Sequence, residues 1–436
     1  MNAQNDIETR LAELLKEIKD GDQWQVGYPG NQNFDYSPLI PFLSHCLNNI
    51  GDPFHQTHYR GNTHQFEREV ILHFAQLTGL DPDDAWGYVT SGGTEGNMYG
   101  LYLARELHPE GMLYFSEEAH YSILKIARVL NMPHTTVKRR ADGEIDYDDL
   151  RDMLTVHRGR PAIILATIGT TMRGAVDDIP AILQIIDDLN IGENYIHADA
   201  ALSGMILPYV DDPQPFGFDA GIDSISISGH KLIGAPLPCG IVLTRKHLVE
   251  TLGRAVELVG VNDTTLSGSR NGLTPLMLWY AINRYGAHEW RETVGGMLDT
   301  AEYAVNRFNE HGINAWRHRN SPTVVFDRPS QEVFDRWQIA PEGDVAHIIT
   351  MPPRGLPHHR PIGRGLHQPA FRTAAGTRSP ASGNCPSASR AGDGARSRNN
   401  DAAHRDHGGK PHRDRCPDCR HSGRGRSEPQ QHRDRE

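Results

Sequence analysis

Apolar side chains near the start of the chain recur at the spacing of one helix face. The positions are Ile7, Leu11, Leu14, Leu15 and Ile18. Because side chains three or four residues apart share a face of an α-helix, this pattern predicts an amphipathic helix. Its apolar face has to be buried on another surface, and a second subunit is one candidate. We interpret residues 1–60 as an N-terminal helical segment associated with a dimer.

From about residue 85 the pattern changes to short apolar runs separated by helix-like stretches or long connections. The runs predict strands at residues 86–89, 112–115, 162–167, 195–198, 224–228 and 240–244, and the helical stretches are residues 97–107, 121–130 and 178–189. This alternation is typical of a mainly parallel sheet covered by helices on both faces. We therefore expect an α/β fold in which residues 61–285 form a large domain.

A smaller C-terminal α/β domain is predicted for residues 286–350. Residues 287–312 have the pattern of a long helix that ends at Gly312, and residues 323–326 and 346–350 have the pattern of strands. The pattern breaks at Met351, after which Arg, Pro, Gly, Ser and His dominate. A segment so poor in apolar residues cannot offset the entropy of ordering it, so we predict that residues 351–436 form a disordered basic tail.

The abrupt change at Met351 is what a frameshift near the end of the gene would produce. This hypothesis predicts that the small domain is incomplete, and resequencing around codon 350 tests it. The tail contains Cys416-Pro417-Asp418-Cys419 with His412 and His421 close by. We expect no metal site there, because the histidines lie too close to the cysteine pair for the usual zinc spacing.

Composition and charge narrow the class of protein. The chain has 436 residues, of which 38% are hydrophobic, enough for one large domain and a smaller one. Its net charge is −11, and residues 1–350 carry 27 Lys and Arg against 47 Asp and Glu, whereas the tail carries 17 against 8. An acidic body disfavours nucleic acid as a partner.

Three further observations indicate a cytoplasmic protein. No apolar run reaches the ~18 residues of a membrane span, so we expect no membrane partner. The charged start lacks the apolar centre of a secretion signal. Cys46 and Cys239 are the only cysteines in the first 350 residues and are far apart, which is typical of a reducing compartment rather than a disulfide framework.

The strongest local signal for chemistry is the run Ser228-Gly229-His230-Lys231, directly after a predicted strand. Ligands of open α/β sheets collect at the carboxyl ends of strands. A lysine at that position can form a Schiff base with an aldehyde. A lone lysine after a strand is more often solvated surface, so the interpretation depends on its neighbours.

Asp199 also ends a predicted strand, and small residues follow it, among them Ala201. A buried carboxylate there can pair with a protonated pyridine nitrogen and keep the ring able to accept electrons. The small side chain of Ala201 would let such a ring pack closely. Taken alone, Asp199 could equally be a helix cap.

The run Thr90-Ser91-Gly92-Gly93-Thr94-Glu95-Gly96-Asn97 joins a predicted strand to a predicted helix. Glycines permit a close backbone approach, and helix N-terminal amides with hydroxyl groups form a phosphate cradle. The run does not match the pattern of nucleoside triphosphate sites, and by itself a Gly-Gly pair indicates only a turn. His120, after the predicted strand at 112–115, could lie on the face of an aromatic cofactor, or could simply begin a helix.

These motifs, in this order, resemble those of the group II pyridoxal-phosphate-dependent decarboxylases, and among them the short bacterial histidine decarboxylases. The likeness covers roughly residues 20–350. The further matching runs are Gly27-Tyr28-Pro29, Phe34-Asp35-Tyr36, Gly169-Thr170-Thr171, residues 199–207, Pro238-Cys239-Gly240 and residues 267–272. The resemblance implies fold type I of the pyridoxal-phosphate-dependent transferases, with a seven-stranded type of sheet. It also implies a homodimer or a higher homo-oligomer with active sites at the subunit interface.

The resemblance also implies roles for individual residues. Lys231, His120 and Asp199 would be catalytic, with Lys231 carrying pyridoxal 5′-phosphate, Asp199 on its ring nitrogen, and His120 stacked on its ring and near the substrate. The other residues implied to bind the cofactor are Gly92, Gly93, Thr94, Thr170, Ala201, Ser228 and His230. Arg270 is a candidate for binding the cofactor phosphate or the substrate carboxylate, since a guanidinium binds such anions in a fork.

The implied reaction is decarboxylation of an amino acid, with L-histidine converted to histamine and carbon dioxide as the first hypothesis. Position 273 is Leu, where the short histidine decarboxylases usually carry His, which weakens the expected preference for an imidazole. A decarboxylase of serine or of an aliphatic or aromatic amino acid is the alternative within the same chemistry. A truncated chain that binds the cofactor with little turnover is the alternative of a different class.

Overall fold

The computed structural model describes residues 3–22, 24–55, 57–250, 252, 254–256 and 261–352. The predictions for the tail beyond residue 352, including its disorder and the Cys416–Cys419 pair, lie outside the described residues. The predicted boundaries between the N-terminal segment, the large domain and the small domain stay predictions.

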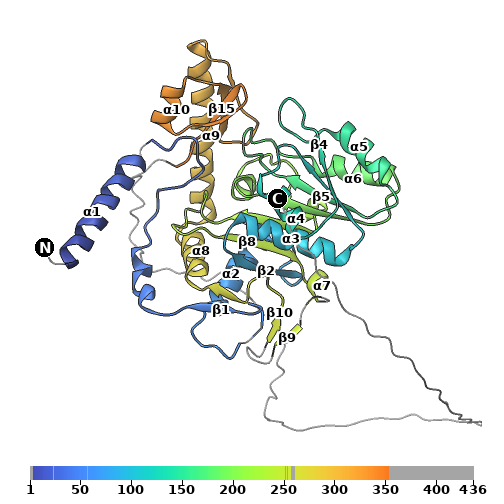
Figure 1. Cartoon of the computed structure of the whole chain (residues 1–436), viewed down its shortest axis with the longest axis horizontal. Helices are drawn as coiled ribbons and strands as arrows, with labels where there is room; N and C mark the ends of the chain where they lie inside the picture. Colours follow the sequence, from blue (N-terminus) through green and yellow to red (C-terminus); the bar gives the residue numbers. More distant parts are fainter. Residues whose placement is uncertain are drawn as a thin grey trace, which may run out of the picture. The chain divides into compact units, whose positions relative to one another are not determined.

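A seven-stranded sheet forms the centre of the fold (Figure 1). Its strands are β2 (Ala85–Thr90), β3 (Met112–Ser116), β4 (His134–Val137), β5 (Ala162–Thr167), β6 (Asn194–Asp199), β7 (Ser224–Ser228) and β8 (Gly240–Arg245), in the spatial order β2-β8-β7-β6-β5-β3-β4. Strand β8 is antiparallel to both of its neighbours, and all other pairs are parallel. The predicted mainly parallel α/β sheet is confirmed.

The central strands are buried because helices cover both faces of the sheet. Along β5, Ile163 and Leu165 belong to one hydrophobic cluster, whereas Ile164 and Ala166 belong to another. The first cluster includes side chains of α3 (Gly93–Leu107) and α4 (Ser122–Val129), and the second includes those of α2 (His64–Leu77), α5 (Tyr147–Val156) and α6 (Ile179–Asp188). Adjacent residues of a strand point to opposite faces, so this division separates the two layers of helices.

Local capping decides where two of these helices begin. The Asp146 carboxylate accepts hydrogen bonds from the first-turn amides of α5, and the Asp178 carboxylate accepts one from Ala181 N–H at the start of α6. Aspartate at this position satisfies amides that have no partner within the helix. Helix α3 begins at Gly93, four residues before the predicted start, so the Gly-Gly turn belongs to the helix N-terminus.

A four-stranded antiparallel sheet follows the long helix α9 (Ala287–Glu310). Its strands are β12 (Ala315–Trp316), β13 (Thr323–Asp327), β15 (Val345–Ile349) and β14 (Ala340–Glu342), in that spatial order, with α10 (Gln331–Trp337) between β13 and β14. The N-terminal segment runs along this sheet, where Ile349 N–H donates to the Val26 carbonyl at 2.8 Å. A Cβ on Gly27 would lie 2.6 Å from Ala340 N, so only glycine fits there.

The predicted N-terminal helix is α1 (Ala3–Asp22). Its apolar face is not covered by the described part of the chain, since Ile7, Leu11, Leu14, Leu15 and Ile18 are each more than half exposed. Figure 1 shows α1 set apart from both sheets. The remaining elements are η1 (Ser37–Ser44), β1 (Asn48–Ile50) paired with β11 (Ser269–Asn271), η2 (Ser203–Met205), η3 (Leu207–Tyr209), η4 (Phe218–Ala220), α7 (Lys246–Val249), β9 (Arg254–Val256) paired with β10 (Val261–Asp263), and α8 (Leu273–Arg284).

Candidate active site

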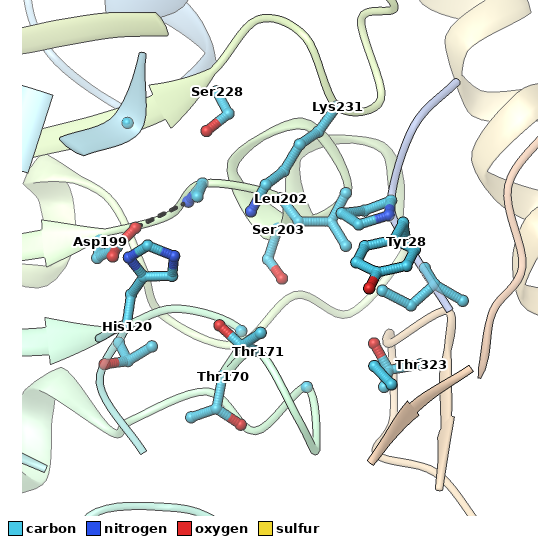
Figure 2. A pocket seen from close by; sticks show the side chains of 18 of the residues that line it. Tyr28, His120, Thr170, Thr171, Asp199, Leu202, Ser203, Ser228, Lys231 and Thr323 are labelled. Carbon is cyan, nitrogen blue, oxygen red and sulfur yellow. Dashed lines mark hydrogen bonds between the residues drawn. The ribbon is translucent and has the colours of Figure 1, made fainter. Parts of the chain in front are cut away.

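Lys231 extends from the turn after β7 into a cavity of about 310 Å³ at the carboxyl ends of the parallel strands (Figure 2). The turn depends on Gly229, because a Cβ there would lie 2.7 Å from both Cys239 Sγ and a Leu278 methyl group. Burial lowers the pKa of Lys231, and the nearby Asp199 carboxylate raises it in part. A lysine with a lowered pKa is neutral more often and is therefore a better nucleophile.

Asp199 lies at the end of β6, the strand next to β7, and its carboxylate faces the same cavity (Figure 2). Asn97 Nδ2 donates to Asp199 Oδ2 at 2.7 Å, and Ala201 N–H donates to Asp199 Oδ1 at 3.3 Å. The residue is only 5% exposed. These two hydrogen bonds fix the orientation of the carboxylate at the cavity wall.

A buried chain of side chains supports this carboxylate. Because Asn97 donates to Asp199 through its amide nitrogen, its amide oxygen accepts from His197 Nε2–H at 3.0 Å, and His197 Nδ1 accepts from the Ser224 hydroxyl at 2.7 Å. Burial lowers the pKa of His197 to about 3, so the ring stays neutral. Asn97 and His197 belong to sequence runs noted above, but the hydrogen bonds through which they orient Asp199 were not predicted from the sequence.

His120 follows β3 and reaches the cavity from the side nearest Asp199 (Figure 2). Its Nδ1 lies 2.7 Å from Ser122 Oγ and accepts from Ser122 N–H at 3.4 Å, which leaves the proton of the neutral ring on Nε2. Burial lowers the pKa of His120; Asp199 raises it, and Lys231 and Lys125 lower it further. The ring is therefore neutral at neutral pH, a state suited to stacking on an aromatic group.

The N-terminus of α3 faces the cavity. Gly93 and Thr94 in its first turn line the cavity together with Ser228 and His230. A Cβ on Gly93 would lie 2.9 Å from Ser228 Oγ, so a larger residue would close the space between the helix and this hydroxyl. Helix amides and hydroxyls around such a space suit a phosphate. Gly92 caps the helix but does not line the cavity itself.

Two other predicted cofactor residues line the same cavity. Thr170 is buried, and its Oγ1 accepts from Ala175 N–H at 3.1 Å, which shapes the turn between β5 and α6. Ala201 follows Asp199, and a Cβ on Gly93 would lie 4.0 Å from its methyl group. The structure thus brings together at one cavity all the predicted site residues except Gly92 and Arg270.

The predicted role of Arg270 is wrong for this cavity. Its guanidinium forms a buried ion pair with Glu67 and donates to the Gly51 carbonyl at 3.0 Å, away from the cavity lining. The physical reason is that Glu67 is fully buried and needs a cation. Leu273 also lies outside the cavity, buried among Leu276 and Met277. The presence of Leu at position 273, where the short histidine decarboxylases usually carry His, therefore does not change the cavity wall.

The wall on the other side of the cavity was largely missed by the sequence interpretation. It is lined by Tyr28, Thr171, Ser203, Ser321, Thr323 and His347. Figure 2 shows Tyr28 and Thr323 across the cavity from Asp199. His347 is buried on β15 and its Nε2 lies 3.1 Å from the Gly27 carbonyl. Tyr28, Thr171 and Ser203 belonged to matching runs of the sequence without a predicted role, whereas Ser321, Thr323 and His347, on or next to the four-stranded sheet, carried no local signal for a site.

Comparison with known proteins assigns this arrangement to a family. The model of the pyridoxal-dependent decarboxylase conserved domain matches residues 71–327, which include Lys231, Asp199 and His120. The chain belongs to the pyridoxal-dependent decarboxylase family. It is therefore a carboxy-lyase that uses pyridoxal 5′-phosphate, as the motifs predicted.

The relatives of this pyridoxal-dependent decarboxylase include bacterial histidine decarboxylases. The chain is 47% identical to histidine decarboxylase of Vibrio anguillarum over 354 residues, which cover 81% of this chain and 92% of the relative. It is 49% identical to histidine decarboxylase of Pseudomonas fluorescens over 339 residues, covering 77% and 82%. The predicted likeness to the short bacterial histidine decarboxylases is confirmed.

Solved structures place this decarboxylase in fold type I. L-methionine decarboxylase from Streptomyces sp. 590 matches with a TM-score of 0.73 and 26% identity, covering 80% of this chain and 92% of that one. Glutamate decarboxylase from Lactobacillus brevis shows the same fold, with a TM-score of 0.64 and 16% identity over 78% and 87% of the two chains. The side chains at the cavity of this decarboxylase fit the cofactor, because a buried amine, a fixed carboxylate and a helix N-terminus surround one space.

Proposed function

We propose that this chain decarboxylates L-histidine to histamine and carbon dioxide, with Lys231, Asp199 and His120 as its catalytic residues. The observation that carries the proposal is the convergence of the Lys231 amine and the Asp199 carboxylate on one cavity from neighbouring strand ends. The choice of substrate is supported by relatives at 46–49% identity that are histidine decarboxylases.

Each residue contributes a separate task. The Lys231 amine, whose lowered pKa favours its neutral form, would hold the cofactor through its aldehyde. The Asp199 carboxylate, held by Asn97, would pair with the protonated ring nitrogen. When bound, pyridoxal 5′-phosphate supplies an electron sink for the bond that breaks at Cα. Neutral His120 covers one face of the cavity and excludes water there.

The cofactor phosphate is assigned to the N-terminus of α3. Gly93 and Thr94 offer first-turn amides, and Ser228 and His230 lie at the same end of the cavity. Thr170 and Ala201 line the space between this end and the opposite wall. Hydrogen bonds from helix amides to an anion orient it as well as bind it.

The opposite wall of the cavity suits a polar side chain such as an imidazole. A neutral imidazole carries one donor and one acceptor, and the hydroxyl groups of Tyr28, Thr171 and Thr323 can each act as either. A site built from hydroxyls discriminates strongly against substrates that cannot pair with them.

A homodimer in the cytoplasm is part of the proposal. The uncovered apolar face of α1, with Leu11 62% and Ile7 59% exposed, is best covered by a second copy of this chain. The described helices include none that is long and apolar enough to cross a membrane.

Decarboxylation of another amino acid is the second candidate, favoured by the structural match to L-methionine decarboxylase. The test is carbon dioxide release by the full chain, reconstituted with pyridoxal 5′-phosphate, from a panel containing histidine, methionine, serine, glutamate and the aromatic amino acids. We expect histidine to give the highest kcat/KM. A higher kcat/KM for any other member rejects histidine as the substrate, and no release from any member rejects the activity of this chain.

A further inference from the structure

Four charged side chains form a connected ion-pair network beside the cavity. Arg173 contacts the Glu118 carboxylate directly, and its Nη1 lies 2.6 Å from Glu342 Oε2. Arg139 Nε lies 3.0 Å from Glu118 Oε1. The side chains of Glu118 and Arg173 are only 3% and 7% exposed, whereas that of Glu342 is 46% exposed. The centre of the network is therefore buried and one end faces solvent.

The network joins three segments that contribute to the cavity wall. Glu118 lies two residues before His120 in the connection between β3 and α4. Arg173 follows Thr170 and Thr171 in the turn after β5. Glu342 ends β14 of the four-stranded sheet, whose first residue, Ala340, also lines the cavity. One guanidinium thus connects two loops of the seven-stranded sheet with a strand of the other sheet.

The surrounding backbone is shaped around Arg173. Gly143 has a φ of +97°, and a Cβ there would lie 2.7 Å from Arg173 Cδ. Gly174 has a φ of +70°, and a Cβ there would collide with Ser321 Oγ, just before β13 of the four-stranded sheet. Positive φ values and close approaches of this kind are readily accepted only by glycine. The packing leaves the arginine stem little freedom to take another position.

The burial of its ion pair with Glu118 makes Arg173 difficult to replace. The pKa of Glu118 is raised to about 7, because the effect of burial, with smaller contributions from Glu342 and Glu117, exceeds the lowering by Arg173 and Arg139. An exposed ion pair contributes little, but removing one partner of a buried pair leaves a charge without compensation. Loss of Arg173 would disturb both the Glu118 connection and the contact with β14.

We propose that Arg173 is a positioning residue: it holds strand β14 against the loops that carry His120 and Thr170–Thr171, and so sets the width of the substrate side of the cavity. The inference rests on the proposed decarboxylase activity, but not on which amino acid is the substrate. Because Arg173 does not line the cavity, its effect acts through the residues that do.

The decisive variant is Glu342→Gln in the cofactor-loaded full chain, because it cuts only the exposed end of the network. We expect KM to rise ~5–20-fold while kcat stays within ~2-fold, since a wider cavity weakens substrate binding more than chemistry. Glu342→Asp should recover part of the loss. Arg173→Lys keeps the positive charge but lacks the planar guanidinium group, and it should raise KM to a similar degree. Arg173→Met should lower kcat as well.

A matched control is Arg151→Met, which breaks the ion pair between Arg151 and Asp188, at 2.7 Å and with both side chains 40% exposed. It should leave KM and kcat unchanged. Wild-type KM in folded Glu342→Gln and Arg173→Lys would overturn the inference, as would an equal rise in Arg151→Met. If Arg173→Met does not fold, the Glu342→Gln variant, at a half-exposed position, still tests the inference.

A second measurement is independent of turnover. Amide hydrogen exchange in residues 117–121 and 170–174 should be faster in Glu342→Gln than in the wild type, and unchanged in Arg151→Met. Unchanged exchange in both loops would contradict the positioning role even if the wild type released no carbon dioxide. Absence of turnover in the wild type together with faster exchange in the variant would reject the proposed activity and keep the structural coupling.

Discussion

Asn97 and Asp199 are 102 residues apart in the chain, yet the Asn97 amide donates a 2.7 Å hydrogen bond to the Asp199 carboxylate. This contact links the first helix of the cavity to the end of the central strand β6. It leaves the carboxylate one orientation, and the neutral His197 ring fixes the amide in turn.

Replacing Asn97 by Ala should reduce kcat by ~10–100-fold, the range expected when a supporting hydrogen bond to a functional carboxylate is lost. The variant should still bind cofactor, because Lys231 and the α3 N-terminus are unchanged. Steady-state kinetics and the visible absorbance of the bound cofactor measure the two effects separately. Asn283→Ala is a suitable control, since its amide donates to the Trp279 carbonyl within the same helix, α8. A variant with wild-type kcat would show that Asp199 needs no support from Asn97.

Lys231→Ala should fold normally and lose turnover, because no other side chain of the described cavity offers an amine. Borohydride treatment of the wild type should fix the cofactor to Lys231, as located by peptide mass, and the variant should retain no covalent label. Circular dichroism checks that the fold is intact. Full activity in Lys231→Ala would reject the mechanism.

Asp199→Ala should lose most of its activity while it retains some cofactor, because the carboxylate acts on the ring nitrogen and the phosphate end is untouched. The expected loss is at least ~100-fold in kcat, since the protonated form of the cofactor's pyridine nitrogen is no longer favoured. Cofactor content after gel filtration and single-turnover kinetics are the measurements. Retention of the full rate would remove the electron-sink role of Asp199.

The stability of the protein should depend on pH through Glu118. Its pKa is raised from 4.5 to about 7, mainly by burial, so the folded state binds a proton at Glu118 more readily than the unfolded state does. The contribution to stability is present below pH 4.5 and is lost as the pH rises through about 7. Between about pH 5 and about pH 8 the free energy of unfolding of the wild type should fall by ~1–3 kcal/mol relative to Glu118→Gln.

Urea unfolding of both proteins at several pH values provides this comparison. Glu110→Gln is the matched control, because Glu110 is exposed and is not among the groups that shift the pKa of Glu118, so it should leave the pH dependence as in the wild type. Parallel pH profiles for the wild type and Glu118→Gln would show that Glu118 does not titrate in this range.

The uncovered face of α1 should mediate association. The double variant Leu11→Glu, Leu14→Glu places charges on a face whose leucines are 62% and 52% exposed in one chain. We expect the oligomer of the variant to dissociate at a higher total concentration than that of the wild type, as measured by sedimentation, because burying two carboxylates in an apolar interface is unfavourable and weakens association. Glu13→Gln, on the polar side of the helix, is the control. A variant that remains fully associated would exclude this face from the interface.

Several features of this protein could be predicted from the sequence alone. Strand β5 is buried along its whole length, and its run of apolar residues marks it in the sequence, whereas the equally buried β7 alternates Ser and Ile. Lys231 and Asp199 each follow such a strand, and the parallel arrangement then requires both side chains to lie at one edge of the sheet. The spacing of apolar residues likewise identified α1 and the long helix α9.

Other features were decided only by the tertiary structure. Arg270 has the chemistry of an anion-binding residue, but its partner is Glu67, 203 residues away, rather than a ligand. The support of Asp199 by Asn97 and the cavity wall formed by Thr323 and His347 likewise depend on contacts between distant segments. The spacing of apolar residues indicates which side of a helix or strand is buried, because the backbone geometry of each element repeats. This spacing does not indicate which buried polar groups pair with one another, since those pairs form only when the sheets and loops pack.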